Sequence, residues 1–113
     1  MQREDQVRMA HMRDAARAVA RFIAGRRRED LDTDEMLRFA LVRAVQIIGE
    51  AADKVSPQGR LLVPDAPWRE AIGMRHRLVH AYFDVSLDVL WKTASESVPA
   101  LRTQLEALNL GVE

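Results

Sequence analysis

The chain has 113 residues, of which 48% are hydrophobic, so it is long enough for one domain with a core and too short for two. The 17 basic and 17 acidic residues give no net charge, which argues against a generally basic nucleic-acid-binding coat but leaves room for a local basic patch. The absence of cysteine excludes disulfides, thiolate catalysis and cysteine-ligated zinc. The N-terminus is charged rather than signal-like, and no apolar run is long enough to span a membrane. We therefore expect one cytoplasmic domain over residues 1–113.

Hydrophobic residues recur at spacings of three and four over residues 4–24, which predicts a first helix with one apolar face. Gly25 follows and is a suitable C-terminal stop. The opposite face carries Arg13, Arg17 and Arg21 at four-residue steps. Such a stripe is typical of a solvated helix face, and we expect it to be exposed.

A second helix is predicted over residues 33–54, with Asp32 and Glu35 as an acidic capping box at its start. Apolar residues occur on more than one side of it, which favours burial in the centre of a bundle or against a second chain. Arg43 and Glu50 interrupt this apolar helix. They are seven positions apart, or about 20° around a helix, so they share a face that either meets water or lines a polar pocket.

The segment SPQGRLLVPDAP is the clearest break in the chain, and Pro67 at its end fits the first position of a third helix running to Tyr82. Asp84 or Ser86 is expected to cap a fourth helix with a long apolar stripe. Pro99 lies inside that stripe and should kink or stagger it. The pattern predicts an all-α protein, an up-and-down four-helix bundle with short connections.

The stretch RHRLVHAYFDV, residues 75–85, concentrates polar and aromatic side chains at the end of the predicted third helix. Arg75 and Tyr82 are seven apart and share one face, whereas His76 and His80 are four apart and share another. Arg75 and His80 are separated by about 140° on an ideal helix, so one rigid helix does not aim both at a single point. Two copies facing each other across a two-fold axis would bring such pairs into one cleft.

Two of the three interpretations of this stretch involve no catalysis. His76 and His80 have the spacing of a zinc-binding pair, but two ligands are too few, and Arg77 follows His76 where such helices carry Glu. Alternatively, Arg75 and Arg77 are solvated and His80 is a hydrogen-bonded residue at a helix end, which is a common arrangement.

The third interpretation is chemistry on phosphodiesters. A histidine such as His80 can take the proton of a ribose 2′-hydroxyl or donate one to the leaving oxygen. An arginine such as Arg75 can stabilise the charge on the phosphoryl oxygens through its planar fork. Asp84, four residues after His80, could orient the imidazole, and no carboxylate cluster for magnesium is present nearby. From these residues alone, the catalytic and the solvated interpretations both remain open.

MRHRLVHAY contains the pattern Arg-x4-His-x-Tyr, which resembles the HEPN superfamily of helical ribonucleases, and specifically its HepT toxin branch, whose members pair with a minimal nucleotidyltransferase antitoxin. Three longer segments resemble that branch in the same order: ALVRAVQIIGEAADKVS, PWREAIGMRHRLVHAYFDV and LWKTASESVPALRTQL. The resemblance covers about residues 14–105, and the motif positions show no departure from it.

The resemblance implies a HEPN-like bundle that acts as a two-fold homodimer, with the motif helices meeting in a cleft. Arg75 and His80 would be the catalytic pair of a metal-independent endoribonuclease that needs no cofactor, with His76 as a supporting residue. Tyr82 would be the position to which the nucleotidyltransferase antitoxin adds AMP. Supporting positions on the second helix, which resembles the family's IGEAA segment, would be Glu50 and Arg43.

The resulting hypothesis is a ribonuclease toxin of a type VII-like toxin–antitoxin pair, acting on RNA in the cytoplasm and away from membranes. The main alternative is a non-enzymatic helical subunit that docks substrate for a nucleotidyltransferase, which the neutral net charge suits slightly better. A plain structural homodimer is the third possibility, given the apolar second helix. Expression without a partner should be toxic under the first hypothesis and harmless under the second.

Overall fold

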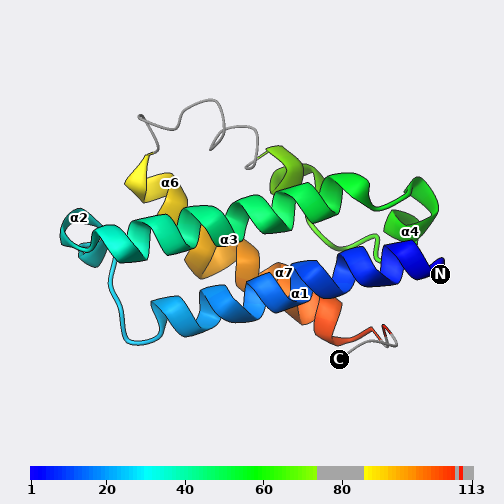
Figure 1. Cartoon of the computed structure of the whole chain (residues 1–113), viewed down its shortest axis with the longest axis horizontal. Helices are drawn as coiled ribbons and strands as arrows, with labels where there is room; N and C mark the ends of the chain where they lie inside the picture. The colour runs from blue at the N-terminus through cyan, green and yellow to red at the C-terminus, as the bar shows by residue number, and fades with distance from the viewer. Residues whose placement is uncertain (74–85, 109, 111–113) are drawn as a thin grey trace.

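Two long antiparallel helices and a third, interrupted helix build the fold in the computed structural model, which describes residues 1–73, 86–108 and 110. All regular elements within these ranges are helical, so the predicted all-α bundle is confirmed. Figure 1 shows α1 and α3 running side by side in opposite directions, with α6, η1 and α7 crossing behind them. The elements are α1 (Arg3–Ile23), α2 (Asp30–Thr33), α3 (Glu35–Lys54), α4 (Pro57–Leu61), α6 (Leu87–Lys92), the π-helical η1 (Thr93–Ser97) and α7 (Val98–Glu106).

The hydrophobic core lies where α1, α3 and the α6–η1–α7 helix meet. Burial of one aliphatic side chain stabilises the folded state by about 1.5–3 kcal/mol relative to leaving it exposed. The largest completely buried side chains are Met9, Met12, Val19, Leu31, Leu41, Leu90, Leu101, Leu105 and Leu110.

Helix α1 ends where the sequence predicts, because Gly25 adopts a positive φ of 71° that side chains other than glycine rarely tolerate. The expected solvated stripe is wrong at Arg13, which is only 7% exposed. Arg17 of that stripe donates from Nε to Glu106 Oε1 of α7 at 2.9 Å. The physical reason is that α1 has neighbours on two sides, α3 and α7, so part of its polar face lies under another helix.

Helix α3 is capped by Asp34, not by the predicted Asp32. The Asp34 carboxylate accepts a hydrogen bond from the backbone N–H of Leu37 at 3.0 Å, and its backbone is extended, as an N-cap requires. Asp32 instead lies within the short helix α2, whose Leu31 is completely buried. Burial of Leu31 holds residues 30–33 in a helical turn, which moves the extended cap position to Asp34.

The proline-rich segment after α3 contains a short helix, α4, where the sequence predicts only a break. Ser56 caps it by accepting from the backbone N–H of Gly59 at 3.0 Å, and Pro57 occupies its first turn. The serine–proline pair was the signal that could have predicted this helix. Further on, the chain is helical again over residues 68–73, and Pro67 accepts at its carbonyl from Ala71 N–H at 3.0 Å.

The last helix begins at the predicted cap Ser86, whose hydroxyl accepts from Val89 N–H at 3.3 Å. The predicted interruption near Pro99 is confirmed, because η1 separates α6 from α7 and Pro99 lies in the first turn of α7. A proline lacks the N–H that would continue the helical ladder, and a π-helical turn is one way for a helix to accommodate that loss. The alternative cap Asp84 lies outside the described residues.

Candidate active site

The five predicted site residues of the motif stretch, Arg75, His76, His80, Tyr82 and Asp84, lie outside the residues that the structure describes. The structure does describe the residues that flank the stretch. Gly73 precedes it at the end of the helical residues 68–73, and Ser86 follows it as the cap of α6. The surroundings of the candidate site are therefore built from these two ends and from the helices that hold them.

Trp68 lies at the start of the helical residues 68–73, which precede the motif stretch in the sequence. Its indole Nε1–H donates to the Val63 carbonyl at 2.9 Å, and its ring lies 6.0 Å from the guanidinium carbon of Arg60. Arg60 in turn donates from Nη2 to the carbonyls of Ala52 and Asp53, at 3.2 and 3.3 Å. Because these are the last carbonyls of α3, Arg60 and Trp68 connect the C-terminus of α3 to the helix that leads toward Arg75.

A buried carboxylate on α1 binds the residue that caps α4, the helix that carries Arg60. Asp5 of α1 is 3% exposed and accepts from Ser56 twice, from the hydroxyl at 2.5 Å and from the backbone N–H at 2.9 Å. These hydrogen bonds, the hydroxyl first, lower the pKa of Asp5 and outweigh the opposing effect of burial. Gly59 approaches so closely that a Cβ there would lie 2.6 Å from Asp5 Oδ2. Helices α1 and α4 are thus locked together by residues far apart in sequence.

Arg28 contacts α6, the helix that follows the motif stretch in the sequence. Its Nη1 donates to Asp32 of α2 at 2.9 Å, and its Nε donates to Asp88 in the first turn of α6 at 2.5 Å. Both hydrogen bonds raise the pKa of Arg28, the Asp32 bond most. The start of α6, two residues after the motif stretch, is thereby joined to the connection between α1 and α3.

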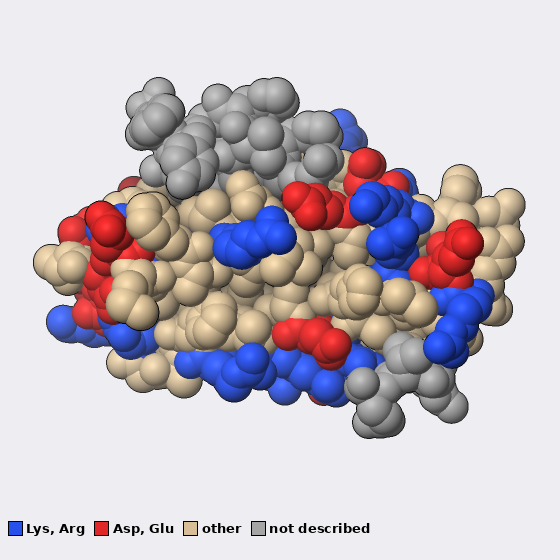
Figure 2. Space-filling view, in the orientation of Figure 1, with Lys and Arg blue, Asp and Glu red and all other residues tan. Residues whose placement is uncertain are grey.

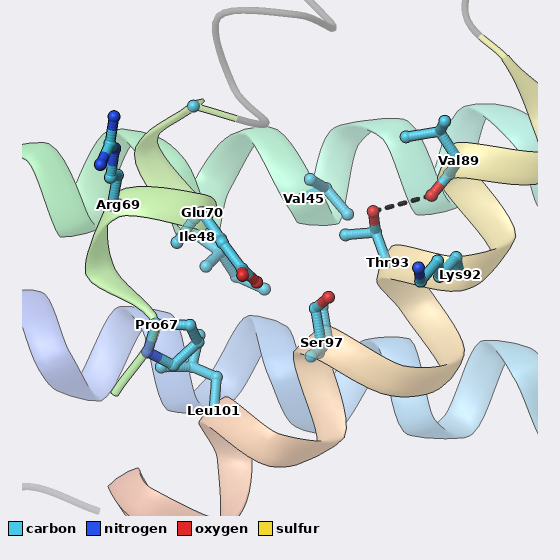
Figure 3. A pocket seen from close by; sticks show the side chains of 13 residues that line it. Val45, Ile48, Pro67, Arg69, Glu70, Val89, Lys92, Thr93, Ser97 and Leu101 are labelled. Carbon is cyan, nitrogen blue, oxygen red and sulfur yellow. Dashed lines mark hydrogen bonds between the residues drawn. The ribbon is translucent and has the colours of Figure 1, made fainter. Parts of the chain in front are cut away.

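A cavity of about 690 Å³ lies between the residues that precede the motif stretch and those that follow it. Its walls come from α3, residues 67–73 and the α6–η1–α7 helix, and they include Gly73, two positions before the motif stretch. Figure 3 shows Glu70 and Ser97 directed into this space and Arg69 directed away from it. The Thr93 hydroxyl donates a hydrogen bond to the Val89 carbonyl at 2.8 Å. The walls are mainly apolar, and the charged groups along them are Arg69, Glu70 and Lys92.

The two predicted site residues on α3 lie together. Arg43 and Glu50 approach within 4.0 Å, Nη1 to Oε1, and their side chains are 64% and 44% exposed. Neither lines the cavity, to which α3 contributes Val45 and Ile48. Among the described residues, no three histidines, cysteines or acids gather as a metal site would require. None of the described helices is long and apolar enough to cross a membrane.

The described residues form the small all-α protein that the sequence predicts. Comparison with known proteins identifies its family. Residues 12–108 match the family described as ribonuclease HepT-like. The chain belongs to the HepT-like ribonuclease family.

Three curated relatives are similar over about 80 residues. A "probable ribonuclease HepT" of Thermococcus cleftensis is 45% identical over 71% of this chain and 73% of its own. A "putative RNase" of Methanocaldococcus jannaschii is 37% identical over 69% and 76%, and another of Caldanaerobacter subterraneus is 36% identical over 71% of each chain. No solved structure gives a significant match.

Proposed function

We propose that the protein is a metal-independent endoribonuclease and the toxin of a type VII-like toxin–antitoxin pair in the cytoplasm. The observation that carries this proposal is the family match over residues 12–108, because it includes the whole motif stretch from Arg75 to Asp84. Relatives in three organisms carry ribonuclease names, which supports RNA as the substrate.

The chemistry of the motif residues supports cleavage of RNA without a metal. His80 takes the proton of the ribose 2′-hydroxyl or donates a proton to the leaving oxygen, and RNA supplies its own nucleophile. Arg75 stabilises the charge that accumulates on the phosphoryl oxygens. His76 and Asp84 support this pair, Asp84 by orienting the imidazole. Since an ideal helix would separate Arg75 from His80 by about 140°, the active unit in this proposal is a homodimer.

Substitution of the catalytic pair tests the ribonuclease proposal. We expect His80→Ala and Arg75→Ala to abolish RNA cleavage and growth inhibition while circular dichroism stays unchanged, and cleavage by the unmutated protein to persist in a metal chelator. The matched control is His11→Ala, which removes an exposed histidine of α1 and should cleave like the unmutated protein. If purified His80→Ala cut RNA at the normal rate, the catalytic assignment would be wrong. Harmless expression of the unmutated protein without a partner would favour the docking-subunit alternative.

Regulation by AMP addition is the second part of the proposal. A nucleotidyltransferase antitoxin would attach AMP to the Tyr82 hydroxyl, and the bulky anion would exclude RNA and attract Arg75, which would share a face with Tyr82 on an ideal helix. We expect Tyr82→Phe to remain toxic when the antitoxin is co-expressed, because its side chain has no hydroxyl to modify. Intact mass should show one AMP adduct on the unmutated chain and none on Tyr82→Phe. An adduct of the same mass on Tyr82→Phe would contradict this assignment.

A further inference from the structure

Helix α3 presents one continuous stripe to solvent along its whole length. At about 100° per residue, six side chains lie within about 40° of a single line on the helix surface. Met36 and Phe39 are large apolar residues that are 83% and 56% exposed, and Ile47 is half-buried. The stripe consists of Met36, Phe39, Arg43, Ile47, Glu50 and Lys54.

Most of this stripe lies away from the core, although Ile47 packs against core residues, and none of its six residues lines the cavity. The core side of α3 carries Leu41, Ala44 and Ile48, all 5% exposed or less. Within the described residues, α1 and α2 are the main neighbours of α3, and they leave the stripe uncovered. Scattered exposed apolar residues are ordinary, but a helix-long stripe that combines them with fixed charges is typical of a protein–protein interface.

The charges on the stripe are arranged symmetrically for a second copy of the same helix. If two α3 helices pack antiparallel about a two-fold axis near Gln46 and Ile47, Arg43 of each protomer lies opposite Glu50 of the partner subunit. The same operation places Phe39 opposite Lys54 of the partner subunit, where the alkyl chain and ammonium group of a lysine suit an aromatic ring. Within one chain, Arg43 and Glu50 form a long ion pair of 4.0 Å, between Nη1 and Oε1, and their side chains are 64% and 44% exposed.

We propose that a second copy of this chain docks on the stripe of α3, antiparallel, through two reciprocal Arg43–Glu50 ion pairs flanked by Phe39 and Met36. In an isologous interface of this kind, the two-fold axis forms the Arg43–Glu50 pair twice, so each of the four charges has one partner. The inference rests on the proposed homodimeric ribonuclease and deepens it, because it names the face through which the dimer forms.

A mixing experiment tests the reciprocal pairs directly. In Arg43→Glu, two acid–acid contacts replace the two ion pairs, and in Glu50→Arg two base–base contacts do. Each variant alone should therefore associate at least about tenfold more weakly than the unmutated chain. An equimolar mixture should recover association as a heterodimer, because one subunit then carries two acids and the other two bases. Sedimentation gives the dissociation constants, and native mass spectrometry identifies the heterodimer.

The mixing result separates an interface from an ion pair within one chain. If Arg43 and Glu50 interacted only within their own helix, mixing the two variants would restore nothing. The matched control is Arg21→Glu, which makes the same charge change at an exposed position of α1 and should dimerise normally. The proposal is overturned if both single variants dimerise like the unmutated chain, or if the mixture associates no better than its components.

The α3 interface and the catalytic assignment can be refuted separately, so the two proposals are distinguishable. Undisturbed dimers of Arg43→Glu and Glu50→Arg would remove the α3 interface and leave the ribonuclease assignment untouched. Normal RNA cleavage by His80→Ala would remove the ribonuclease assignment and leave the sedimentation result unchanged.

Discussion

Asp5 shows how one buried side chain organises the approach to the motif stretch. Its carboxylate is 51 residues away from Ser56 in the sequence, yet it accepts two hydrogen bonds from that residue. Ser56 at the same time caps α4, and Arg60 of α4 reaches both the end of α3 and the ring of Trp68. A charge at position 5 therefore stabilises contacts up to the helix that precedes Arg75.

Replacing Asp5 by Asn should destabilise the fold in a pH-dependent way. The variant loses charge-assisted hydrogen bonds, so we expect the free energy of unfolding to fall by about 1–2 kcal/mol near neutral pH. The Ser56 hydrogen bonds lower the folded-state pKa of Asp5 below its ordinary value of 3.8. Stability from the carboxylate is therefore complete above that ordinary value and is lost as pH falls through the folded-state pKa.

Denaturant unfolding of both proteins at neutral pH and at several pH values below 3.8 measures this effect. The difference between unmutated protein and Asp5→Asn should shrink as the pH falls. Asp65→Asn is the control, since it removes an exposed acid and should change the free energy of unfolding little at any of these pH values. A constant difference for Asp5→Asn across the acid range would contradict the linkage.

At the scale of elements, the boundaries of α3 depend on a competition between two nearby aspartates. Both Asp32 and Asp34 are suitable capping residues, and sequence alone favours Asp32 because Glu35 follows at the capping-box distance. Packing of Leu31 selects Asp34 instead. Arg26 reinforces that choice by donating to Asp34, and this hydrogen bond is the main reason that the pKa of Asp34 is lowered.

Alanine substitutions distinguish the two caps. Asp34→Ala should lower the midpoint of thermal unfolding, because it leaves the Leu37 N–H at the start of α3 without its acceptor. Asp32→Ala removes only an exposed partner of Arg28 and should have a smaller effect. Calorimetry of the two variants at the same pH makes the comparison. A larger loss for Asp32→Ala would mean that Asp32 caps the helix in solution.

At the scale of the whole molecule, the proposed site depends on where its two catalytic groups come from. An ideal helix separates Arg75 from His80 by about 140°, which favours a site built from Arg75 of one protomer and His80 of the other. Two such sites would exist in each dimer. The α3 interface proposed above would hold the two protomers in the required two-fold relation.

Complementation between inactive variants tests whether the site is shared. Arg75→Ala and His80→Ala should each be inactive, but their heterodimer keeps one site with both groups intact. When subunits exchange freely, half of the dimers are heterodimers with one working site of two, so about a quarter of the normal cleavage rate should return. If both groups act within one protomer, the mixture stays inactive.

The sequence by itself determined what depends on neighbours along the chain. Helical periodicity predicted α1, α3 and the last helix, Gly25 and Ser86 marked ends that the structure confirms, and Pro99 predicted the interruption. The motif stretch and its resemblance identified the family, because the residue types and spacing of a motif are written in the chain itself. The roles of its residues stay predictions.

Only the tertiary structure decided what depends on residues that meet from distant parts of the chain. The periodicity of α1 could not show that Arg13 is buried, nor that Asp5 accepts hydrogen bonds from Ser56. The same holds for the choice of Asp34 over Asp32 and for the exposure of Met36 and Phe39 on a helix whose apolar sequence favours burial. Burial is set by the packing of several helices at once, so a pattern within one helix predicts which residues share a face but not what covers that face.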